Sequence, residues 1–217
     1  MWRVLGLVLV MLLLGVGAGY VVAGATHEEP VVADRAGPVP AESPAYPTPP
    51  VFDVLPDPDT PPLEPGIPSE RVRLRTDRDR GQTLFVDQPT GWTNRRLGDN
   101  WHWAIDENPL NTYVLRVGLT EGLHQSVAVA KAARIAAFED AEANGDLENF
   151  TIETQTDDTL IATYIADDHL RLTMERWVAF GDSNIASAVV AVTGRTVDRT
   201  GLMDLLERTT ASMDPND

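Results

Sequence analysis

The residue types best suited to molecular recognition gather between Gly91 and Asn111. Three tryptophans, two arginines and a histidine lie there: Trp92, Arg95, Arg96, Trp101, His102 and Trp103. Tryptophan and arginine are enriched at binding hot spots. The sequence therefore predicts a candidate binding surface in this stretch, a groove at the rim of the fold for a protein partner or an apolar ligand.

The tryptophans allow two interpretations. On a strand through residues 101–103, both indoles point to one face and His102 points to the other. The indoles can close the hydrophobic core, or they can form an exposed patch. We expect Trp92 to belong to the core, and at least one tryptophan of the strand to be exposed beside Arg95 or Arg96.

Sequence motifs for catalysis and cofactor binding are missing. The chain contains no phosphate loop, dinucleotide fingerprint, nucleophile elbow or zinc spacing, and it has no cysteine. Asp167-Asp168-His169 offers possible metal ligands, but it lies between two expected strands, where a polar hairpin turn explains it. The sequence thus predicts no catalytic residue, no metal site and no cofactor.

The elements that would position the candidate surface follow a hydrophobic N-terminal segment. Residues 4–23 carry no charge, and their length matches the roughly 30 Å hydrocarbon core of a bilayer. A basic flank with Arg3 precedes the segment and acidic residues follow it, so the positive-inside rule exports the rest of the chain. Residues 1–25 are expected to be a transmembrane signal anchor, or a signal peptide cleaved after Ala25.

A proline-rich acidic segment, residues 26–70, separates that segment from the domain. It holds most of the 16 prolines of the chain. Proline removes backbone donors and fixes φ, so this composition favours a disordered stalk. The sequence places a globular extracytoplasmic domain at residues 71–217.

Alternating apolar residues predict strands in both halves of this domain, and each half ends in a helix. The expected strands are 71–75, 84–86, 101–105, 113–119, 150–156, 160–166, 170–178 and 185–192. The expected helices are 126–144, which ends at Asn144-Gly145, and a C-terminal one containing Leu202, Leu205 and Leu206. This order predicts an α+β fold, a largely antiparallel β-sheet covered by two α-helices.

Two strands carry finer expectations. Residues 170–178 alternate apolar and polar side chains, which predicts one buried face and one solvent-facing face. Residues 185–192 are apolar on both faces, as in a central strand that is covered on both sides.

The element order resembles the PsbP-like α/β sandwich, and in style the small actinobacterial lipoproteins of the LpqN type. The local motif is Phe85-Val86-Asp87-Gln88-Pro89-Thr90-Gly91-Trp92, similar to the strand-Pro-x-Gly-Trp opening of that family. The resemblance covers roughly residues 71–214. This chain lacks the lipobox cysteine, so its tether would have to be the helix itself. The resemblance implies a binding or assembly role and no shared catalytic residues.

Charge narrows the choice of partners. The net charge of −16 disfavours nucleic acid and anionic lipid headgroups. Membrane contact is expected through residues 4–23, and a protein of the cell envelope is the expected partner. The sequence favours a membrane-tethered, non-enzymatic extracytoplasmic binding or assembly module. The alternatives are a carrier of a small apolar ligand in a cavity between sheet and helices and, third, a hydrolytic enzyme.

The uncharged segment and its flanks generate a test of topology. Protease added to intact spheroplasts should digest residues 71–217, because the positive-inside rule places them outside the cytoplasm. Immunoblotting with an antibody against the domain measures the loss, and a cytoplasmic protein serves as the protected control. Protection of the domain until the membrane is lysed would refute this topology.

Overall fold

A computed structural model describes residues 52–76, 83–106, 112–120 and 124–215 of the chain. The expected anchor or signal peptide at residues 1–25, and the expected stalk as far as residue 51, lie outside these ranges. Within them, no helix is long and apolar enough to cross a membrane.

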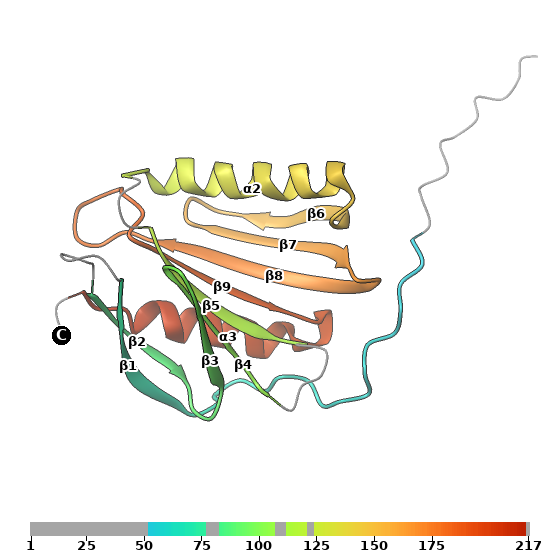
Figure 1. Cartoon of the computed structure of the whole chain (residues 1–217), viewed down its shortest axis with the longest axis horizontal. Coiled ribbons are helices and arrows are strands. Elements are labelled where there is room, and N and C mark those ends of the chain that lie inside the picture. Colours follow the sequence, from blue (N-terminus) through green and yellow to red (C-terminus); the bar gives the residue numbers. More distant parts are fainter. Residues whose placement is uncertain (1–51, 77–82, 107–111, 121–123, 216–217) are drawn as a thin grey trace, which may run out of the picture. The chain divides into compact units, whose positions relative to one another are not determined.

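Antiparallel strands dominate the described part of the chain (Figure 1). The strands are β1 Ser69–Arg75, β2 Thr83–Pro89, β3 Thr93–Leu97, β4 Asn100–Ala104, β5 Val114–Leu119, β6 Glu148–Gln155, β7 Thr159–Ala166, β8 His169–Val178 and β9 Ala188–Gly194. The helices are α2 Val127–Asn144, the 3₁₀ turn η1 Thr196–Asp198 and α3 Arg199–Ala211. The expected α+β class, a mostly antiparallel sheet with two helices, is confirmed.

The main sheet has seven strands in the order β3-β4-β5-β9-β8-β7-β6, while β1 and β2 pair separately as a hairpin. As expected, β9 is a central strand, lying between β5 and β8. The first half contains one strand more than the sequence predicts. Strand β3 escaped the prediction because it is an edge strand with mostly exposed polar residues, so no apolar alternation marks it.

Two hydrophobic cores lie on opposite faces of the main sheet. Helix α3 and the β1–β2 hairpin cover one face, which we call the α3 face; the core there includes Leu84, Trp103, Leu115, Met174, Val190, Leu202 and Leu206. Helix α2 packs against the part of the other face formed by β6 to β8, as Figure 1 shows; we call it the α2 face. Its core includes Phe138, Leu147, Leu160, Trp177 and Ala186.

The helix boundaries follow their capping residues. Ser126 accepts a hydrogen bond from the backbone N–H of Val129 at the start of α2. Gly145 ends the helix in the left-handed region, with φ of 77° and its N–H bonded to carbonyls of the last turn. Leu202, Leu205 and Leu206, the apolar residues expected on the C-terminal helix, are buried on α3.

The expectation of a solvent-facing side on β8 is wrong. Thr173 and Glu175, which share that side, are each 1% exposed, and Trp177 is 5% exposed. Their burial follows from the position of α2, which lies over this strand. A polar alternation on β8 therefore marks a buried polar face.

Residues 55–66, which we call the N-terminal strap, pack on the domain although the sequence assigns them to a disordered stalk. The N–H of Leu55 bonds to the carbonyl of Asp168 over 2.8 Å. The side chain of Leu63 is in the core, and the N–H of Gly66 donates to Asp204. The domain therefore begins before the expected boundary at Arg71.

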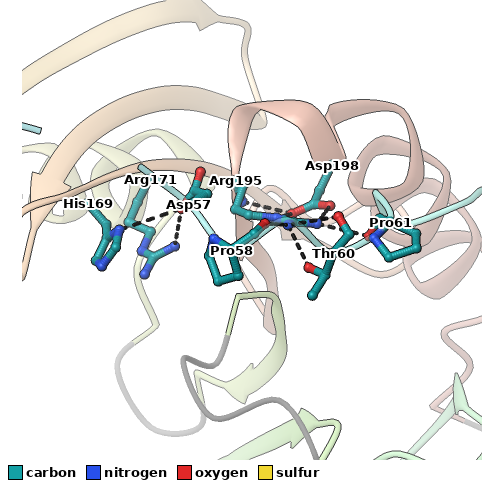
Figure 2. Close-up of polar contacts among 8 residues, drawn as sticks. All are labelled: Asp57, Pro58, Thr60, Pro61, His169, Arg171, Arg195 and Asp198. Atoms are coloured by element: carbon teal, nitrogen blue, oxygen red, sulfur yellow. Dashed lines mark hydrogen bonds and ion pairs between the residues drawn. The ribbon is translucent and has the colours of Figure 1, made fainter. Parts of the chain in front are cut away.

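A buried ion pair holds the strap (Figure 2). Arg195 and Asp198 are 1% and 0% exposed, and their closest nitrogen and oxygen are 2.7 Å apart. The guanidinium of Arg195 also donates to three strap carbonyls, those of Pro58, Thr60 and Pro61. The prolines of the strap have no N–H donor but keep their carbonyls, and this arginine satisfies three carbonyls of the strap.

The aspartate of this pair completes the contact. Asp198 accepts from the N–H of Leu63 over 2.8 Å, which fixes the strap above α3. The approach there is close: a Cβ on Gly201 would lie 2.1 Å from the carbonyl oxygen of Leu63. Hydrogen bonding to Asp198 raises the pKa of Arg195 above its already high ordinary value, so the arginine stays charged.

The burial of this pair predicts a large loss of stability in Asp198→Ala. The change leaves the Arg195 charge buried without its counter-ion, so the free energy of unfolding should fall by about 3–5 kcal/mol. Chemical denaturation of the protein measures the loss.

Glu153→Ala is the matched control, since it removes a more exposed ion pair with Arg199. That change should cost less than about 1 kcal/mol. Equal losses in the two variants would contradict a clamping role for Asp198.

Candidate functional site

The structure divides the predicted site residues between the two faces of the sheet. In the β3–β4 register Arg96 pairs with Trp101, and Arg95 pairs with His102. Because side chains alternate along a strand, the Arg96 pair belongs to the α3 face and the Arg95 pair to the α2 face. The six residues expected in one rim groove do not form a single surface.

Both tryptophans of β4 are core residues. Trp103 is 0% exposed and Trp101 is 6% exposed, so the expectation that one of them is open to solvent is wrong. The indole N–H of Trp103 donates to the side-chain oxygen of Gln88. The guanidinium carbon of Arg96 lies 4.9 Å from the centre of the Trp101 ring, a cation–π geometry that covers the indole.

Trp92, which we expect in the core, is half-buried. It packs against the core of the α3 face and stacks on Tyr113 with ring centres 5.5 Å apart. The core packing of Trp101 and Trp103 leaves no exposed indole on β4.

The other two predicted residues line a pocket on the α2 face. Its volume is about 290 Å³, and its walls are Thr93, Arg95, Leu97, His102, Ala104, Ile105, Asp106 and Val114. Strands β3, β4 and β5 supply most of them. The sequence predicted Arg95 and His102 but missed the other six residues, because β3 was not recognised and nothing in the chain marks its register with β4.

Basic side chains lie in one row across these strands. The register aligns Arg95 with His102 and His102 with Arg116. We call these three residues the basic shelf. Sequence reasoning missed Arg116, although the alternation of residues 113–119 could have placed it opposite the core face.

The inner end of the shelf is tied to a buried carboxylate. Glu175, 1% exposed, lies 3.2 Å from a guanidinium nitrogen of Arg116 and 2.8 Å from one of Arg134 on α2. Two guanidiniums thus share one carboxylate, which leaves a net charge of one positive unit. The excess positive charge lies on an otherwise acidic protein, and it favours an anion at the shelf.

His102 is the titratable member of the shelf. Burial lowers the pKa of His102 from the usual 6.5, and the positive charge of Arg116 lowers it further. The imidazole is therefore mainly neutral at pH 7, where it can donate one hydrogen bond and accept another.

The chemistry of the pocket is suited to binding. Arg95 is a permanent cation on an edge strand, and in the part of the chain that the structure describes it makes no ion pair. The hydroxyl of Thr93 donates to Asp106 over 2.6 Å and holds that carboxylate at the rim. No group of three or more potential metal ligands occurs among the described residues.

No protein-family model matches the chain, and no curated protein matches it either.

The environment of His102 predicts the result of an NMR titration. Its pKa should lie below 6.5, and Arg116→Gln should raise it only in part, because burial is the larger cause and persists. Ring proton shifts, assigned by comparison with His102→Asn, measure the change.

Arg96→Gln is the matched control for that titration, because Arg96 lies on the other face of the same strand pair. It should leave the pKa of His102 unchanged. A larger upward shift from Arg96→Gln than from Arg116→Gln would contradict the assignment of faces.

Proposed function

We propose that this chain is a non-enzymatic binding module of the cell envelope, tethered to the membrane at its N-terminus with its domain outside the cytoplasm. Its ligand or partner group occupies the pocket on the α2 face. The uncharged residues 4–23 support the tether, and the resemblance to PsbP-like sandwiches agrees with a binding role. The position of Arg95 is the observation that carries the proposal.

Arg95 is a cation held at a concave site without an ion-pair partner among the described residues. On the same face of β3, two residues after Arg95, Leu97 is 64% exposed. A charged group and an apolar group that both face a pocket are typical of a ligand site. Beside these two residues, the hydroxyl of Thr93 donates a hydrogen bond to Asp106 and so holds the Asp106 carboxylate in place.

Two places could hold a ligand: the pocket on the α2 face, or a cavity between the sheet and α3. The residues between the sheet and α3 favour the pocket. Large side chains fill that space with 0% exposure; they include Leu84, Trp103, Leu115, Met174, Leu202 and Leu206. A carrier of the kind that the sequence allowed would need this volume empty. The open pocket of the α2 face is the better candidate.

Site-specific photocrosslinking in the native membrane tests the proposal. A photoreactive residue at Leu97 should give a discrete adduct, identified by mass spectrometry, that is lost with Arg95→Gln. The same residue at Val197, which is 62% exposed, is the matched control and should give no such adduct. Identical adducts from both positions, or an adduct at position 97 that does not depend on Arg95, would refute binding at this pocket.

A further inference from the structure

The basic shelf and the walls of the pocket together define the chemistry of a ligand, and this argument rests on the function proposed above. The pocket volume of about 290 Å³ is at the lower end of the range for small-molecule sites. Its occupant is therefore a small molecule or a short terminal group.

Charge selects an anion. Arg95 contributes a positive charge that forms no ion pair among the described residues, and the Arg116–Glu175–Arg134 cluster carries a net positive charge. The neutral imidazole of His102 lies between these charges in the strand register and can donate a hydrogen bond. An oxyanion at this place would receive a charge-assisted hydrogen bond from Arg95, which is stronger than a neutral one.

Asp106 sets an upper limit on the negative charge of the ligand. Its carboxylate is part of the pocket wall and is fixed by the hydroxyl of Thr93. Among the described residues that line the pocket, Arg95 supplies one permanent positive charge and Asp106 one negative charge. A second negative charge on the ligand would therefore have no cationic partner in the lining and would be repelled by Asp106. The site therefore favours a carboxylate over a phosphate monoester, which carries nearly two charges at neutral pH.

The remaining walls require an apolar body. Leu97, Ala104, Ile105 and Val114 line the pocket beside the charged groups. The free energy falls when a ligand covers apolar side chains and removes them from water. A fully polar anion would leave them hydrated.

We infer that the pocket binds a small monocarboxylate with a compact apolar body. Its carboxylate pairs with Arg95 and accepts a hydrogen bond from His102, and its apolar body contacts Ala104 and Val114. Arg96 and Trp101 take no part, because they lie on the α3 face.

Fluorine NMR with a matched probe series tests this inference on the full chain in nanodiscs, with empty nanodiscs as the blank. The probes are 4-fluorobenzoate, 4-fluorobenzyl alcohol, 4-fluorobenzylamine and 4-fluorophenyl phosphate, which share one ring and differ in charge. The benzoate should bind about tenfold or more tightly than each of the others, since one charged hydrogen bond corresponds to at least that factor.

Variants locate the site. Arg95→Gln should weaken binding of the benzoate about tenfold and leave the alcohol unchanged, because only the anion uses the guanidinium. Arg73→Gln on the exposed side of β1 is the matched control and should change neither. Arg95 is on an exposed edge strand, so this variant keeps the fold, which the unchanged amide spectrum verifies.

Each contrary result has a distinct meaning. Equal affinity for the benzoate and the alcohol overturns the anion class, and tighter binding of the phosphate overturns the monocarboxylate. If no probe binds while the Arg95-dependent crosslink at position 97 persists, the ligand class is wrong and the binding module stands. If the crosslink fails while the benzoate binds at Arg95, the envelope function is wrong and the site stands.

Discussion

The carboxylate of Glu175 is the constraint on which both α2 and the candidate site depend. A buried carboxylate without partners costs several kcal/mol, so β8 can carry Glu175 beneath a helix only if cations reach it. Arg134 reaches it from α2 and Arg116 reaches it from β5. Since one carboxylate recruits two guanidiniums, the packing of the helix leaves positive charge at the border of the open part of the sheet. The electrostatics of the basic shelf thus follow from a requirement of the fold.

The contact between the N-terminal strap and Arg195 is the inverse arrangement, in which one cation serves several acceptors. The N-terminal strap has more carbonyls than N–H groups, because its five prolines supply no donor. Arginine has five donors and no acceptor, so the single side chain of Arg195 satisfies several strap carbonyls together with Asp198. Proline content therefore does not exclude order where a buried arginine is available. For this reason residues 55–66 pack on the domain, although their composition predicts a disordered stalk.

The sequence was sufficient wherever local chemistry decides the structure. Ser126 and Gly145 mark the ends of α2, the apolar alternation of β5 gives its core face, and the apolar run of β9 marks it as a central strand. It was insufficient wherever a partner distant in the chain decides. Glu175 was expected in solvent because alternation alone cannot show that a helix covers the polar side of a strand. Strand β3 has no signal of its own, since among the described strands it pairs with β4 alone and its side chains are mostly exposed.

The two adjacent arginines of β3 show why the candidate site was half right. Arg95 and Arg96 are neighbours in the chain, but a strand turns successive side chains to opposite faces. Arg96 covers Trp101 and serves the core, whereas Arg95 faces the pocket beside His102. The residue that completes the basic shelf, Arg116, is 21 positions from Arg95 and reaches the same row only through the register of three strands. A binding surface on this fold is therefore defined by strand parity and register, and a cluster of residue types along the sequence mixes core and surface.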